Sequence, residues 1–184
     1  CIRDRSRFKP ASLLCRINSE AGRSGIEISK ADEEILKLCE HTFQISKGLN
    51  DPTSLPLTSL WDRAGREGRM PSSDEIEEAK NLISWPTVEW GDGRVFLPEK
   101  GMALEIGGFG KEYAVDRLIG FAKYLGIVDC LVDFGRDVSA LGQPPNGPVW
   151  VVGIEDAKKE DAVAFRLAVS GKGLATSGNG RRYR

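Results

Sequence analysis

The sequence predicts an α+β fold with a mainly antiparallel sheet and flanking helices. Helical patterns cluster in the first half of the chain, whereas most strand patterns lie in the second half. The strand patterns are joined by short, turn-like segments, and parallel strands would need long crossover connections instead. These observations favour an antiparallel α+β arrangement over repeated β-α-β units.

Two helices carry clear start signals. Ser29 fits an N-cap with Asp32 three residues on, and an apolar stripe then continues at helical spacing until Gly48. Ser72 and Glu75 form the same signature for a second helix. A third helical pattern follows a glycine-rich turn near residue 110.

The remaining segments are predicted as strands, turns and loops. Residues 6–18 read as a loop entering a helical turn, 50–61 as a Pro/Thr/Ser-rich loop, and 63–70 as an exposed charged linker. Strands are predicted from short apolar runs bounded by turn residues. They cover residues 26–28, 88–90, 94–97, 102–106, 128–134, 138–141, 149–154, 162–169 and 174–176.

Composition excludes several classes of protein. The chain has 184 residues, of which 40% are hydrophobic and 29% charged, as in ordinary globular proteins. The net charge of −1 provides no bulk field for nucleic acid or an anionic membrane, so no nucleic-acid partner is expected. No apolar run approaches the ~18 residues of a membrane span.

The cysteines and the histidine do not form a metal motif. Cys1, Cys15, Cys39 and Cys130 show no C-x-x-C spacing, and His41 is the only histidine, which argues against a zinc site. The last three cysteines lie in apolar surroundings and are expected to be small core residues. His41 falls outside the apolar stripe of its helix and is expected to be solvated.

The glycine-rich turn is the best candidate for a site. Residues 105–116 (EIGGFGKEYAVD) place three glycines between a predicted strand and a helix start. Backbone N–H groups and the positive end of the helix dipole would meet there, which suits an anion. Lys111 adds a positive charge, and Asp116 adds a carboxylate one helical turn further on. On spacing alone, a tight turn with solvated charges explains the pattern equally well.

This stretch resembles the D-[LF]-G-[GA]-[IY]-[AG]-K-G-[YF]-A-[VA]-D block of the ApbE family, the FAD:protein FMN transferases. Residues 6–18 match [MS]-[ST]-[YF]-x-P-x-S-E-[LI]-S-R-[LI]-N, and residues 48–61 match G-[AG]-F-D-P-T-[VL]-x-P-L-[VI]-x-L-W. Residues 130–179 resemble L-[VI]-[ND]-x-G-G-D, W-x-[VI]-G-I and [AV]-[AS]-T-S-G-[DN]-[YF] in succession. Four blocks in the right order make the resemblance specific.

The resemblance implies a T-fold-like ApbE domain over residues 6–184 that lacks both ends, including a C-terminal metal-binding part. It implies Mg²⁺-dependent cleavage of FAD, transfer of FMN through a phosphoester to a threonine of a partner flavoprotein, and release of AMP. The implied partner is a subunit of a redox complex. The implied location is extracytoplasmic, periplasmic or at the inner membrane, with membrane association through a missing N-terminus. The 184 residues alone are expected to bind FAD weakly or not at all, without catalysis.

The resemblance also assigns site residues, although it identifies no catalytic residue. The expected FAD contacts are Phe8, Leu49, Asn50, Asp51, Glu105 and Lys111, with Lys111 near the phosphates and ribose. The backbone carbonyl of Gly108 is the expected Mg²⁺ ligand.

Other roles remain open for these residues. Phe8 could simply pack, Asp51 could cap the turn before Pro52, and Glu105 could pair with Lys111 or Arg117 on the surface. The loop residues Arg136, Asp137, Thr176 and Ser177 are expected to be structural and to shape the cleft.

Four positions depart from the family pattern. Glu105 replaces Asp, Glu112 replaces Gly, Asn50 replaces an aromatic residue, and Arg136 replaces Gly. These changes suggest a divergent subfamily. They leave a non-catalytic FAD-binding carrier module as the alternative function, and a domain that binds nothing as a third.

Overall fold

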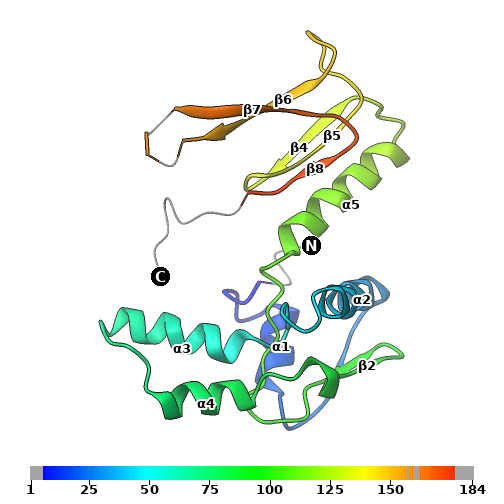
Figure 1. Cartoon of the computed structure of the whole chain (residues 1–184). Helices are drawn as coiled ribbons and strands as arrows, with labels where there is room; N and C mark the ends of the chain where they lie inside the picture. Colours follow the sequence, from blue (N-terminus) through cyan, green and yellow to red (C-terminus); the bar gives the residue numbers. More distant parts are fainter. Residues whose placement is uncertain (1–5, 157, 160–161, 177–184) are drawn as a thin grey trace. The chain divides into compact units, whose positions relative to one another are not determined.

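A computed structural model describes residues 6–156, 158–159 and 162–176 (Figure 1). The contacts within the chain divide it into two compact units, one ending at Ile106 and the other beginning at Gly107. All strand pairs in the described residues are antiparallel, and five α-helices accompany them, which confirms the predicted α+β class. The single domain predicted for residues 6–184 stays a prediction.

The first unit contains four helices and a small sheet with strand order β1-β3-β2. Its elements are α1 (Leu13–Ser19), β1 (Ile26–Glu27), α2 (Lys30–Ile45), α3 (Leu55–Arg66), α4 (Ser73–Asn81), a 3₁₀ turn (Trp85–Thr87), β2 (Glu89–Gly91) and β3 (Arg94–Phe96). The largest fully buried apolar side chains of its core are Trp85, Leu97, Met102, Leu104 and Val95.

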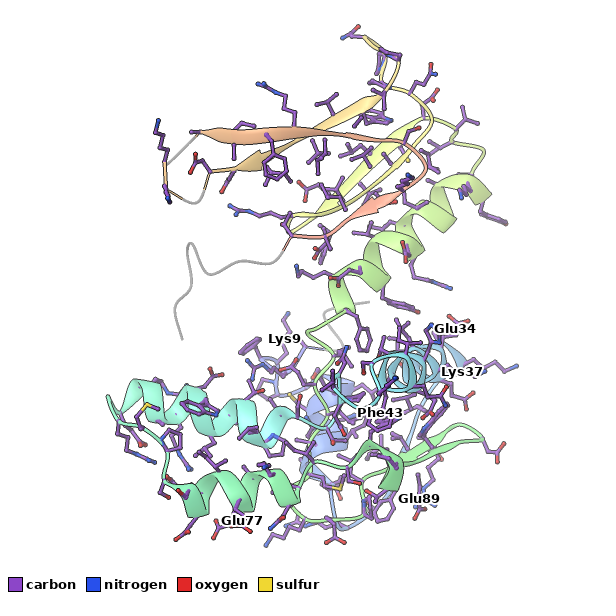
Figure 2. All side chains as sticks on the ribbon, in the orientation of Figure 1. Lys9, Glu34, Lys37, Phe43, Glu77 and Glu89 are labelled. Atoms are coloured by element: carbon purple, nitrogen blue, oxygen red, sulfur yellow. The ribbon has the colours of Figure 1, made fainter. Side chains whose placement is uncertain are left out.

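Helix α2 begins as predicted. The Ser29 hydroxyl accepts a hydrogen bond from the Asp32 amide at 3.3 Å, and the Asp32 carboxylate accepts one from the Ser29 amide at 3.1 Å. The helix buries an apolar face that includes Cys39 and exposes the charged side chains of Glu34 and Lys37 (Figure 2). The predicted capping box of α4 is also present, and His41 is exposed as expected.

The predicted loop at 50–61 is wrong over its second half, where α3 begins. Leu57, Leu60, Trp61 and Ala64 follow helical spacing, and a proline in the first helical turn is favourable because its missing N–H is not needed there. The density of proline, serine and threonine concealed this periodicity. The linker predicted at 63–70 is wrong over residues 63–66, which complete the helix.

The strand predicted at 102–106 is also wrong, since the structure has no strand there. The Asn18 side chain replaces a strand partner: its Nδ2 donates to the Leu104 carbonyl at 3.1 Å, and its Oδ1 accepts from the Leu104 amide at 2.8 Å. The Glu105 amide donates to the Pro52 carbonyl at 2.7 Å. The apolar run is therefore core, with its backbone satisfied by one side chain and a loop.

The second unit consists of α5 and two small sheets. Its elements are α5 (Gly110–Tyr124), β4 (Cys130–Phe134), β5 (Asp137–Leu141), β6 (Trp150–Glu155), β7 (Val163–Val169) and β8 (Gly173–Leu174). β4, β5 and β8 form one sheet, β6 and β7 form the other, and α5 packs against β4 and β5 (Figure 1). These strands confirm the predictions for the second half of the chain to within two residues at most ends.

A two-residue turn joins β4 and β5 and gives a first testable prediction. Gly135 and Arg136 both have positive φ, 65° and 74°, as in a type I′ turn. The Arg136 guanidinium forms an exposed ion pair with Glu155 at 3.1 Å. We expect Arg136→Gly to stabilise the unit by about 0.5–1 kcal/mol, because glycine removes the left-handed strain and the lost ion pair is weak.

Urea unfolding followed by circular dichroism measures this gain. Arg136→Ala is the matched control, because it also loses the ion pair but keeps a Cβ at positive φ. A glycine variant no more stable than the alanine variant would contradict the explanation.

Cys39 gives a second prediction, which concerns pH. Its side chain is fully buried, and burial raises the pKa of its thiol from 9.0 to about 12. The stabilisation from keeping this thiol neutral is complete below pH 9 and is lost as the pH rises from 9 towards 12, because only the unfolded chain ionises there. The expected slope is about 1.4 kcal/mol per pH unit.

The measurement compares urea unfolding of the wild type and Cys39→Ala between pH 8 and 10.5, since the difference isolates this thiol from other titrating groups. Cys39 should also resist thiol reagents until the chain unfolds. Parallel pH curves for the two proteins would show that the thiol is accessible in the folded state.

Candidate functional site

In the first unit, Arg7 contacts two of the predicted flavin-binding residues, Phe8 and Glu105. The Arg7 Nε lies 2.8 Å from Glu105 Oε2, and its guanidinium also lies 3.4 Å from Asp62 Oδ2 on α3. The guanidinium carbon stands 4.6 Å from the centre of the Phe8 ring. Within the first unit Arg7 is a partner of the Glu105 carboxylate, and the alternative pairing of Glu105 with Lys111 or Arg117 stays a prediction. Sequence reasoning missed Arg7, whose only signal was its position beside Phe8.

Asp51 has a structural role that was open from the sequence. One carboxylate oxygen accepts hydrogen bonds from the Thr53 amide at 2.7 Å and the Thr53 hydroxyl at 2.6 Å, and the other accepts from the Trp85 amide at 3.2 Å. The Thr53 hydroxyl in turn accepts from the Ser84 amide at 2.8 Å. Asp51 thus shapes the turn around Pro52, and its FAD contact stays a prediction.

Leu49 and Asn50 lie on the loop after α2. The Leu49 side chain is 93% exposed, and the Asn50 amide donates to the Ser46 hydroxyl at 2.9 Å. Phe8 is also exposed, at 78%. These three side chains are accessible to a ligand, but no contact in the structure assigns one to them.

Lys111 stands in the first turn of α5, in the second unit. The Lys111 ammonium contacts the carboxylate of Asp137, which is 3% exposed at the start of β5, whereas 43% of the Lys111 side chain is exposed. Helix α5 begins at Gly110, and its N-cap residue Phe109 makes no side-chain cap hydrogen bond to the first-turn N–H groups, which carry the positive end of the helix dipole. Asp137 was expected to be a structural loop residue. It is the first residue of β5, and its carboxylate is the ion-pair partner of Lys111.

The glycine turn and the first turn of α5 contain Gly108, the expected Mg²⁺ ligand. Gly108 is exposed, and a side chain at this position would meet no atom within 4 Å. One oxygen of Glu112 is buried and lacks a hydrogen-bond partner among the described residues. Across the same residues, no three His, Cys, Asp or Glu side chains group together as metal ligands do. The role of the Gly108 carbonyl as a Mg²⁺ ligand stays a prediction.

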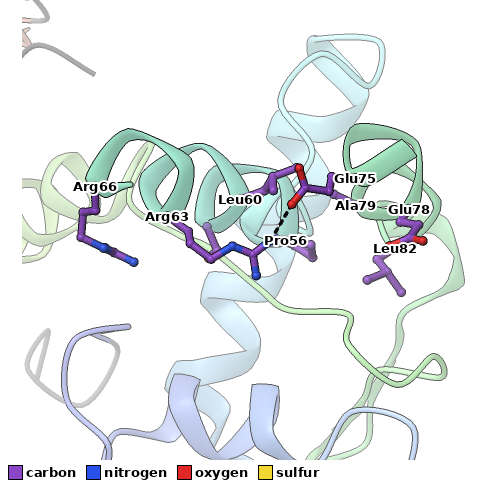
Figure 3. A pocket seen from close by; sticks show the side chains of 9 residues that line it. Pro56, Leu60, Arg63, Arg66, Glu75, Glu78, Ala79 and Leu82 are labelled. Atoms are coloured by element: carbon purple, nitrogen blue, oxygen red, sulfur yellow. Dashed lines mark hydrogen bonds and ion pairs between the residues drawn. The ribbon is translucent and has the colours of Figure 1, made fainter. Parts of the chain in front are cut away.

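A cavity of the first unit is lined by none of the predicted site residues. It measures about 420 Å³ between α3 and α4 and is lined by Pro56, Ser59, Leu60, Arg63, Arg66, Glu75, Glu78, Ala79 and Leu82 (Figure 3). Arg63 and Glu75 form an ion pair of 3.4 Å at its wall, and the Arg69 guanidinium lowers the pKa of Glu75 to about 2. None of the predicted flavin contacts lines this cavity.

The other structural expectations have mixed outcomes. The Thr176 hydroxyl donates to the Arg136 carbonyl at 3.2 Å, as expected for a loop residue, while Ser177 lies outside the described residues. Cys39 is buried, but Cys15 and Cys130 are only half-buried. None of the helices described here is both long and apolar enough to cross a bilayer.

Comparison with known proteins gives consistent matches along the chain. The FAD:protein FMN transferase of Salmonella typhimurium is 28% identical over 185 residues, which cover 97% of this chain and 53% of that protein. The one from Chlamydia pneumoniae is 26% identical over 174 residues, covering 94% and 53%. This chain therefore spans about half the length of the curated relatives it matches.

Solved structures give the same result for the fold. An ApbE protein of Thermotoga maritima matches with a TM-score of 0.83 at 28% identity, over 99% of this chain and 60% of that one. The apo flavinyl transferase ApbE of Pseudomonas stutzeri matches with a TM-score of 0.81 at 26% identity, over 97% and 58%. A model of the ApbE family matches residues 2–184, and on this match over nearly the whole sequence the chain belongs to the ApbE family.

Proposed function

We propose that the protein containing this chain is a Mg²⁺-dependent FAD:protein FMN transferase. It would join the FMN part of FAD through a phosphoester to a threonine of a partner flavoprotein and release AMP. The relatives named above carry the transferase name, which supports flavin transfer to a protein. Mg²⁺ dependence, the threonine acceptor and AMP release rest on the sequence resemblance.

The observation that carries the proposal is the position of Lys111. Lys111 lies in the first turn of the 15-residue helix α5, whose N-cap residue Phe109 makes no side-chain cap hydrogen bond, and Gly107 and Gly108 ahead of the helix are exposed. A pyrophosphate gains negative charge on its leaving group as the bond breaks, and a lysine with helix N–H groups would stabilise that charge. An ammonium has three donors, so pairing with Asp137 leaves others for phosphate oxygens.

The remaining assignments follow from the first unit. Phe8 offers an exposed aromatic face suited to stacking on a flavin ring. Leu49, Asn50, Asp51 and Glu105 would complete the FAD contacts. The Gly108 carbonyl would bind Mg²⁺ together with further oxygen ligands.

The partner and the location are part of the same proposal. We expect the acceptor to be a subunit of a redox complex and the protein to work outside the cytoplasm, at the inner membrane or in the periplasm. Cell fractionation of the tagged, complete protein tests the location, and recovery with the cytoplasmic fraction alone would contradict it.

The decisive assay uses protein expressed from the complete coding sequence that contains these residues. It is incubated with FAD, Mg²⁺ and a flavoprotein domain carrying the candidate threonine, with a Thr→Val acceptor as control. Release of AMP with an FMN-sized mass gain on the threonine acceptor alone supports the transferase. Tight FAD binding without either product would favour the non-catalytic carrier. The departures from the family pattern at Glu112 and Asn50 leave this alternative open.

A further inference from the structure

Arg7 occupies the centre of a cluster built from three separate segments of the first unit. Its side chain is only 13% exposed, and its guanidinium meets Glu105 at 2.8 Å and Asp62 at 3.4 Å, whose side chains are 19% and 25% exposed. The Phe8 ring lies beneath the guanidinium, 4.6 Å from its central carbon. One planar cation thus contacts two carboxylates and an aromatic ring.

This arrangement restricts the motion of Glu105. A guanidinium presents its donors in a rigid fork, so binding two carboxylates at once fixes the orientation of both. The backbone is held as well, because the Glu105 amide donates to the Pro52 carbonyl at 2.7 Å and the adjoining Leu104 is paired with Asn18. Glu105 is therefore anchored at its backbone and at its carboxylate.

We propose that Arg7 is a positioning residue that holds the Glu105 carboxylate and the Phe8 ring in place for the flavin. The inference rests on the proposed function, since it takes these two residues as FAD contacts.

The test is a double-mutant cycle on protein from the complete coding sequence, with FAD affinity as the readout. Arg7→Ser removes the anchor of Glu105, and Glu105→Asp withdraws the carboxylate from Arg7. Each is expected to weaken FAD binding about tenfold, as a lost partly buried pair would. Either change breaks the same contact, so the double variant Arg7→Ser/Glu105→Asp is expected to bind FAD within about threefold of the weaker single variant.

The controls separate positioning from folding. Arg63→Ser breaks an exposed ion pair elsewhere in the unit and should leave FAD affinity unchanged. Urea unfolding of every variant reports its stability, and Arg7→Lys, which keeps the charge but loses the fork, replaces Arg7→Ser if that variant does not fold. Losses that do not add in the double variant cannot follow from two independent losses of stability, which would add.

The outcomes distinguish the two proposals. Weak single variants and a double variant that binds FAD about as well as the weaker single variant support the positioning role. If the wild type binds FAD and the losses simply add in the double variant, or if the single variants bind like the wild type, the positioning role is overturned and the proposed function stands. If the wild type binds no FAD, the proposed function is overturned, and the positioning role with it.

Discussion

Lys111→Met is expected to destabilise the second unit by about 2 kcal/mol, because it leaves the buried Asp137 carboxylate without its ammonium partner. Loss of one partner of a fully buried pair costs more, but 43% of the Lys111 side chain is exposed and solvent weakens the interaction. In the complete protein, the same change is expected to weaken FAD binding at least tenfold, as the loss of one charged phosphate contact would.

Urea unfolding and FAD titration measure the two effects. Lys172→Met is the matched control, since Lys172 is exposed, and its expected change in stability is within about 0.5 kcal/mol. Adding Asp137→Asn to Lys111→Met should recover about 1 kcal/mol, because the uncompensated charge is gone. Wild-type stability for Lys111→Met would show that Asp137 does not depend on this lysine.

Asp51→Ala is expected to destabilise the first unit by about 3 kcal/mol, the largest effect predicted for a single substitution. The carboxylate accepts three hydrogen bonds, from the amide and hydroxyl of Thr53 and from the amide of Trp85. Thr53 and Trp85 are almost completely buried, so the N–H and O–H groups that lose Asp51 cannot form replacement hydrogen bonds to water. Each bond to a charged group contributes about 1.5–3 kcal/mol, and shared partners make the sum less than additive.

Chemical unfolding with the wild-type m-value is the measurement. Glu77→Ala on the exposed side of α4 is the control, with an expected change within about 0.5 kcal/mol. Thr53→Val, which keeps the shape and removes the hydroxyl, should lie between the control and Asp51→Ala. A fully stable Asp51→Ala that loses FAD affinity would instead mean that Asp51 serves the ligand alone.

The elements that sequence reasoning placed correctly are those specified by neighbouring residues. The capping boxes of Ser29 and Ser72 involve residues three positions apart, and the turn at Gly135 needs only the local backbone preference. The secondary-structure predictions failed where local sequence signals conflicted or where the deciding contact was distant in sequence. Pro56 favoured a loop although it suits a first helical turn, and the apolar run at 102–106 looked like a strand although it pairs with a side chain.

The sequence by itself determined the α+β class, most strands of the second half, the family, and the candidate residues Phe8, Glu105 and Lys111. Only the tertiary structure shows which charged side chains form ion pairs. Arg7 and Glu105 are 98 positions apart in number and Lys111 and Asp137 are 26 apart, so no short-range pattern encodes either pair. A carboxylate needs a partner when folding removes it from water, and the partner is whichever cation the packed chain brings within reach.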